Sequence, residues 1–191
     1  MSAGQLWVGV DSLLRLDLAS VMVSPGTTLC GRSSHGESLR QAIAAGLAAA
    51  EARAHPPEWH DVGVDTTVGL GYVSDLLRQR APLEHIVLVL PEWDNALNGS
   101  PPLDEVLAHA HSVVSAVITL VRGARTALSE GGAAGMTLLT SGEPPKTPAG
   151  AALSAFVTRY VSEEAATFQE RGLSLMIVSQ QAWQPPLIND Q

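Results

Sequence analysis

Four polar side chains of the kinds used in acid–base or nucleophilic catalysis stand close to the ends of expected strands: His85, Glu92, Asp94 and Ser141. A hydroxyl can attack a carbonyl, while a carboxylate or an imidazole can carry a proton near neutral pH. Ser141 has no base beside it in the sequence, and the glycine that follows also fits a plain turn. The chain lacks a G-x-S-x-G elbow, which disfavours a triad hydrolase. These four residues are therefore the catalytic candidates.

Metal chemistry finds little support in the sequence. His109 and His111 are the only close histidine pair, and side chains two residues apart on a helix point about 200° away from each other. Cys30 is the only cysteine, which excludes an intramolecular disulfide and a thiolate cluster. We expect no metal site, and the single cysteine fits a reducing, intracellular compartment.

The composition is apolar and acidic. Hydrophobic residues make up 46% of the 191 residues, charged residues 16%, and the formal net charge is -8. This charge repels phosphate groups, so neither nucleic acid nor a membrane surface is expected as a partner. We see no basic region followed by an apolar run at the N-terminus and no stretch approaching about 20 apolar residues. A cytoplasmic location is the resulting prediction.

Short apolar runs alternate with longer segments of helical periodicity. The runs show little polar alternation, which is typical of strands buried on both faces of a parallel sheet. Strands are expected at 6–10, 27–30, 62–64, 85–90, 135–140 and 173–179, and helices at 38–54, 68–80, 103–128 and 149–171. This order predicts a single α/β domain over residues 1–191, with a doubly wound parallel sheet of about six strands in a three-layer αβα arrangement.

Several segments, in the same order, resemble the short-chain dehydrogenase/reductase (SDR) family. Segments 26–32, 62–67, 85–89 and 135–142 resemble its second to fifth strands, and Ser141 falls at the position of the family's catalytic serine. The sequence Ala-Ala-Leu-Ser-Ala-Phe-Val-Thr-Arg at 151–159 resembles the active-site helix, and 172–179 resembles the sixth strand. The resemblance implies a Rossmann-type fold. Since little chain follows the sixth strand, it also implies a member without the family's substrate lid and last strand.

The segment at the family's cofactor loop departs from the family pattern. In the family, a glycine-rich turn after the first strand lets the pyrophosphate approach a helix N-terminus. The corresponding stretch here, 8–17, contains only Gly9, while Leu13 and Leu14 would carry β-carbons into the path of the phosphate and Asp11 would repel it. Gly69-Leu70-Gly71 lacks a third glycine and fits a plain helix start. We therefore expect no dinucleotide cofactor.

The family's catalytic pair is also missing. Reduction requires a tyrosine and, four residues later, a lysine, so that both side chains face the cofactor. Four residues after Tyr72 and Tyr160 stand a leucine and a glutamate, and the only lysine is Lys146. Matching the active-site helix places Lys146 at the tyrosine position and Gly150 at the lysine position. No alignment produces a Tyr-x-x-x-Lys pair.

Small residues mark two of the expected helices and would let a neighbouring helix approach closely. They are Ala108, Ser112, Ser115, Ala116, Thr119, Ala151 and Ala155. In the resembled family the corresponding two helices build a four-helix dimer interface, so the resemblance implies an interface here. Ordinary packing on the sheet is the alternative.

Two functional hypotheses follow. The first is a catalytically inactive SDR-like subunit that pairs through these helices with an active ketoreductase or dehydrogenase of the family, in a small-molecule or acyl pathway, or with a second copy of itself. The second is a cofactor-independent cyclase, dehydratase or isomerase that uses the vacated cleft with Ser141, Glu92, Asp94 or His85. The sequence leaves both open and does not indicate the substrate.

Overall fold

The computed structural model describes residues 4–13, 26–32, 38–39, 41–42, 45, 57–94, 101–129 and 134–183. In chain order its elements are β1 (Gly4–Val8), η1 (Val10–Ser12), β2 (Thr27–Gly31), β3 (Glu58–Asp61), α3 (Thr67–Arg80), β4 (Leu83–Val89), α4 (Leu103–Ala127), β5 (Gly135–Thr140), α5 (Pro148–Gln169) and β6 (Ser174–Ser179). The described residues among 38–45 are also helical. The alternation predicted from the sequence is confirmed.

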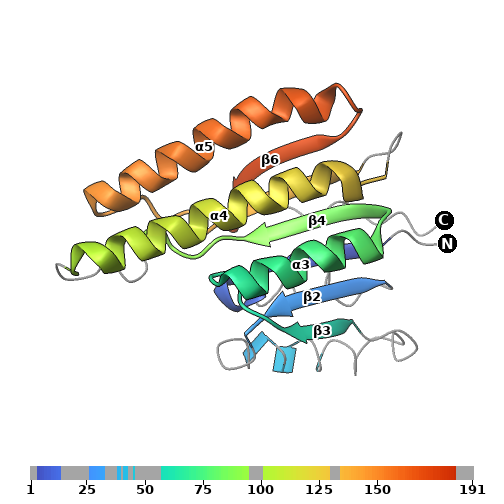
Figure 1. Cartoon of the computed structure of the whole chain (residues 1–191), viewed down its shortest axis with the longest axis horizontal. Helices are drawn as coiled ribbons and strands as arrows, with labels where there is room; N and C mark the ends of the chain where they lie inside the picture. Colours follow the sequence, from blue (N-terminus) through green and yellow to red (C-terminus); the bar gives the residue numbers. More distant parts are fainter. Residues whose placement is uncertain are drawn as a thin grey trace.

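The strands form one parallel sheet in the order β3-β2-β1-β4-β5-β6. Figure 1 shows α3, α4 and α5 side by side across one face of this sheet. The described helical residues Leu39 and Ala42 pack against the opposite face. The chain therefore has the doubly wound, SDR-like Rossmann architecture that was predicted, and the strand order reverses between β1 and β4.

Each central strand feeds two hydrophobic cores because successive side chains point to opposite faces. In β4, Ile86 and Leu88 pack beneath the three helices, while Val87 and Val89 join the core on the other face. That second core is completed by Trp7 and Trp183, whose rings meet edge to face with centroids 5.5 Å apart. Burial on both faces explains why these strands appear in the sequence as continuous apolar runs.

The third strand differs from the sequence prediction. It was expected at 62–64, but β3 comprises Glu58–Asp61 and pairs only with β2. As an edge strand it is partly exposed, so the polar sequence Glu-Trp-His-Asp is tolerated there. Val62 and Val64, which suggested a strand, instead follow it and pack against the core beneath the helices. The apolar residues at 62–64 therefore reflect burial of the loop after the strand, not the strand itself.

Helix α4 is long and apolar enough to cross a membrane by length and composition, so the expectation that no segment approaches such a span is wrong on those two criteria. In the structure, however, a stripe along α4 is buried against the sheet and includes Val117, Leu120, Val121 and Ala124. A core helix passes the same two criteria. Figure 1 shows α4 lying across the sheet between α3 and α5.

Cys30 lies in β2, between β3 and β1, with no exposed surface. Burial, with a smaller contribution from Glu58, raises the pKa of its thiol to about 12. Because the thiolate is the reactive form, we expect the folded protein to resist iodoacetamide at mildly alkaline pH, whereas the chain unfolded in urea is alkylated quickly. Mass spectrometry over time measures both rates. Equal rates in the two states would contradict the buried position of this thiol.

Candidate functional site

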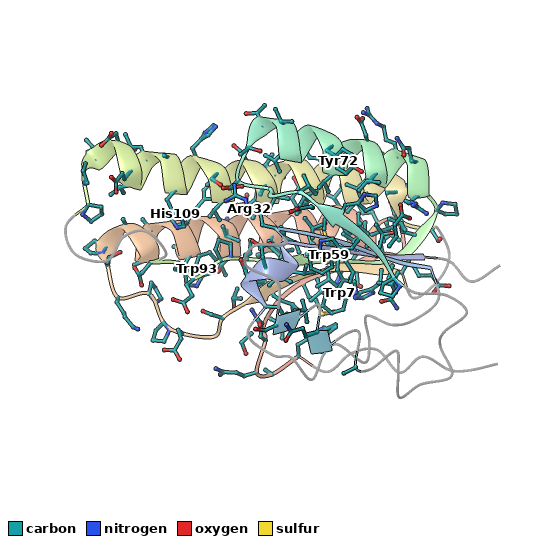
Figure 2. All side chains as sticks on the ribbon, turned by 90° about the horizontal axis from the view of Figure 1, so that it is seen from below. Trp7, Arg32, Trp59, Tyr72, Trp93 and His109 are labelled. Atoms are coloured by element: carbon teal, nitrogen blue, oxygen red, sulfur yellow. The ribbon has the colours of Figure 1, made fainter. Side chains whose placement is uncertain are left out.

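A cavity of about 570 Å³ lies at the carboxyl ends of β1 and β4, where the strand order reverses. We call it the switch-point cavity. Its walls come from the turn after β1, the residues that follow β2 and β3, the end of β4, and one side of α4. Figure 2 labels two of its side chains, Arg32, which follows β2, and His109 of α4. Open α/β sheets bind their ligands in this crevice.

An ion pair closes one side of the cavity. The Arg32 guanidinium donates from Nη2 to both carboxylate oxygens of Asp65, at 2.7 and 2.6 Å. Gly63 makes room for this pair, since a β-carbon there would lie 2.5 Å from Arg32 Nε. The turn is fixed by Thr66, the N-cap of α3, whose Oγ1 accepts a hydrogen bond from the Gly69 N–H at 3.0 Å. The one arginine among the lining residues is therefore neutralised by its neighbour.

Helix α4 contributes an imidazole and a carboxylate to the same cavity. His109 Nε2 lies 3.3 Å from the carbonyl oxygen of Trp93, which can only accept, so this nitrogen carries the proton and donates it. The neutral ring then keeps its lone pair on Nδ1. Burial lowers the pKa of His109 against smaller opposing effects of the Trp93 hydrogen bond and the Asp94 charge, which favours this neutral form. Glu105, one turn earlier on α4, lines the cavity as well.

The described turn after β1 does not fit a dinucleotide pyrophosphate. Gly9 adopts φ +75°, and a β-carbon there would lie 2.5 Å from the carbonyl oxygen of Val89, so one glycine is required. Further along the turn, the N–H groups of Ser12 and Leu13 donate to Gly9 O and Val10 O at 2.9 and 3.1 Å. Asp11 adds a negative charge to the lining. A phosphate bound at this turn would be repelled by the Asp11 carboxylate.

Asp94, a predicted catalytic candidate, is buried and fully engaged by the start of α5. Its Oδ2 accepts from the Lys146 N–H at 2.6 Å, and its Oδ1 accepts from the Thr147 N–H at 3.1 Å and from Thr147 Oγ1 at 2.6 Å. The Lys146 N–H has the largest part in lowering the pKa of this carboxyl, followed by the Thr147 hydroxyl. We call this arrangement the Asp94 clamp. It ties the loop after β4 to the N-terminus of α5.

Of the other three catalytic candidates, His85 alone lies away from the carboxyl edge of the sheet. Ser141 is buried, and its Oγ accepts from the Glu143 N–H at 3.3 Å, as in a turn. Glu92 is exposed in the loop after β4. His85 Nε2 lies 3.3 Å from Thr137 Oγ1 near the amino end of β4, about 13 Å along the strand from its carboxyl end, and burial lowers the pKa of His85. The structure thus separates His85 from the rest.

The cavity residues were not identified as a site from the sequence, although signals for four of them were present. Arg32 and Asp65 directly follow expected neighbouring strands, and the carboxyl ends of parallel strands meet at one edge of a sheet. Glu105 and His109 are four residues apart and so share one face of α4. What the sequence could not show is that this face turns toward the cavity.

The small residues predicted to form an interface divide into two groups. Ala108, Ser112 and Ala116 line the switch-point cavity. Ser115 and Thr119 of α4 are half-buried, while Ala151 and Ala155 of α5 are exposed. Arg125 of α4 and Glu164 of α5 form an ion pair at 3.0 Å that joins the two helices. The exposed members of the set therefore lie mainly on α5.

No family model and no curated protein matches the sequence. Solved structures do match the fold. The chain is similar to a short-chain dehydrogenase from Burkholderia cenocepacia in complex with NADP (TM-score 0.68, 19% identity), with 93% of this chain and 73% of that one covered. It is also similar to the acetoin dehydrogenase of Enterobacter cloacae, with a TM-score of 0.68, 14% identity, and 94% of this chain and 75% of that one covered. A short-chain dehydrogenase/reductase of Serratia marcescens gives a TM-score of 0.66 and 12% identity, with 94% of this chain and 73% of that one covered. At these identities the likeness establishes an SDR-like fold.

Proposed function

We propose that this chain is a catalytically inactive SDR-like subunit of the cytoplasm that associates, through α4 and α5, with an active ketoreductase or dehydrogenase of the same fold in a small-molecule or acyl pathway. The observation that carries the proposal is the Asp94 clamp. In the sequence match to the family's active-site helix, this clamp engages Lys146, which stands at the position of the family's tyrosine.

The first turn of α5 supports the loss of reductase chemistry. Lys146 and Gly150 stand where the family has tyrosine and lysine, and a β-carbon on Gly150 would lie 2.3 Å from Asp94 Oδ1. The N-cap Thr147 accepts from the Gly150 N–H at 3.0 Å and donates to the same carboxylate. A side chain at this position is thus excluded by a buried, hydrogen-bonded carboxylate. The hydrogen bonds of Asp94 anchor the start of α5, and the Asp94 carboxylate leaves no room at position 150 for the lysine that would assist a reduction.

The surface of α4 and α5 supports association. On α5, Ala151 and Ala155 are exposed beside Phe156, whose side chain is 42% exposed and stacks on Tyr160 with ring centroids 6.2 Å apart. At the start of α4, Leu103 and Leu107 are exposed to 72% and 59%. Small residues next to exposed apolar ones allow a second pair of helices to pack closely.

Co-purification tests the proposal. The tagged chain is co-expressed with a reductase encoded beside its gene, and we expect the two to elute together in equal amounts. Ala155→Arg should weaken the association at least tenfold, about 1.4 kcal/mol, because it places a long charged side chain in the contact. Gln79→Arg, at an exposed position of α3, is the matched control and should leave it unchanged.

A stable homodimer that ignores the reductase would contradict the heteromeric proposal. If Ala155→Arg dissociated that homodimer, the helices would still be the interface, but between copies of this chain. The second hypothesis, a cofactor-independent enzyme, gains no support from its four residues, since the Asp94 clamp engages one of them and His85 lies far from the others. The switch-point cavity is what favours a retained small-molecule site.

A further inference from the structure

We propose that the switch-point cavity binds a small organic cation, an amine or guanidine joined to an apolar group, in place of a dinucleotide. This inference rests on the lining of the cavity and does not depend on the pairing proposed above.

The charges around the cavity favour a cation. Among the lining residues are three carboxylates, those of Asp11, Asp65 and Glu105, against the single guanidinium of Arg32. Arg32 is bound to Asp65 through both carboxylate oxygens, so the two charges cancel. Asp11 and Glu105 remain, and within the described part of the chain neither carboxylate has an ion-pair partner. A positive ligand would be attracted, while a phosphate or carboxylate would be repelled.

The hydrogen-bonding groups point the same way. The N–H groups of Ser12 and Leu13 and the Nε2–H of His109 all donate to backbone carbonyls already. The Nδ1 lone pair of neutral His109 and the oxygens of Glu105, one turn away, can accept. An ammonium or guanidinium group supplies several donors to these acceptors without needing to accept any.

The remaining wall is apolar. Leu88 and Leu90, at the end of β4, lie opposite Val113 and Ala116 of α4, and all four line the cavity. A volume of about 570 Å³ falls within the range of ordinary ligand sites and suits a hydrocarbon group of moderate size. The cavity thus combines an acceptor-rich side with an apolar side, which is the pattern that an amphiphilic amine requires.

Calorimetric titration of the intact chain with a matched set of probes tests this inference. The probes are 2-phenylethylamine, the neutral 2-phenylethanol, the anionic 3-phenylpropanoate, and NADP as the phosphate-bearing compound. We expect the amine to bind at least tenfold more tightly than the alcohol, and the two anions to bind more weakly than both. Added salt should weaken binding of the amine and leave that of the alcohol nearly unchanged.

Variants locate the binding. Glu105→Gln should reduce affinity for the amine about fivefold or more, because it removes a lining charge while keeping the size of the side chain. Asp104→Asn removes an equal charge from the same helical turn but lies outside the cavity, so it should have little effect. Equal loss in both variants, tighter binding of either anion than of the amine, or no binding of the amine would overturn the inference. Circular dichroism confirms that each variant is folded.

Discussion

Replacing Asp94 with alanine is expected to destabilise the protein by about 3 kcal/mol. The carboxylate accepts three hydrogen bonds, from the backbone of Lys146 and from the backbone and hydroxyl of Thr147. Asp94 is buried, so alanine at this position leaves the three donors without an acceptor. Each unsatisfied donor costs about 1 kcal/mol or more. The loss also frees the start of α5 from the loop after β4. Urea denaturation followed by circular dichroism measures the free energy of unfolding.

Two comparisons sharpen this experiment. Glu92→Ala, at an exposed position of the same loop, should change stability by no more than about 0.5 kcal/mol. Asp94→Asn keeps one acceptor oxygen, so its loss of stability should lie between those of Asp94→Ala and Glu92→Ala. Since the pKa of Asp94 is lowered in the folded state, its charge stabilises the protein above the unfolded pKa near 4, and this is lost as pH falls through the folded pKa. A wild-type advantage over Asp94→Asn that persisted at lower pH would contradict this account.

The fold could be predicted because its strands are buried on both faces. Runs such as 85–90 and 135–140 can satisfy their burial only inside a parallel sheet between helices, and the structure places β4 and β5 there. The edge strand β3 could not be predicted in the same way. Its residues are partly exposed, so burial imposed no apolar pattern on them, and the valines after it gave a stronger but misleading signal.

The candidate site was less predictable than the fold because its chemistry depends on distances across the sheet. Asp94 was identified from its residue type and its place after a strand, and nothing nearby in the sequence showed that Lys146 and Thr147, more than fifty residues later, engage it. For Arg32 and Asp65 the opposite holds: their place at strand ends was visible, but only the structure shows that they neutralise each other. A sequence alone does not distinguish a charged side chain that is paired in the fold from one that is unpaired.

The two proposals concern different places in the SDR-like fold, the start of α5 and the switch-point cavity. At the start of α5, the position of the family's lysine is a glycine that gives space to a carboxylate anchor. At the switch point, a cavity is present, and its lining carries the carboxylates of Asp11 and Glu105 beside the Arg32–Asp65 ion pair. The proposed loss of reductase chemistry and the proposed preference for a cationic ligand therefore rest on different residues. Either proposal could fail without the other.

Gly150→Ala is expected to destabilise the protein by about 2 to 4 kcal/mol, although alanine is the better helix former by about 1 kcal/mol. The new β-carbon would lie 2.3 Å from Asp94 Oδ1, and this oxygen cannot move away without losing its bonds to Thr147. Gly71→Ala in α3 is the matched control, because its β-carbon would have no neighbour within 4 Å. That variant should gain about 0.5 to 1 kcal/mol.

Opposite signs for the two glycines, measured by the same urea denaturation, would show that the Asp94 clamp is what excludes a side chain from position 150. Combining Gly150→Ala with Asp94→Ala adds a stricter test. The clash needs both partners, so the double variant should lose less stability than the two single losses added together. Additive losses would mean that Gly150 is required for some other reason. If the losses are coupled, the variant that combines Gly150→Lys with Lys146→Tyr should disrupt the start of α5 and show no reductase activity. The reason is that the Asp94 carboxylate already occupies the space that a side chain at position 150 would need.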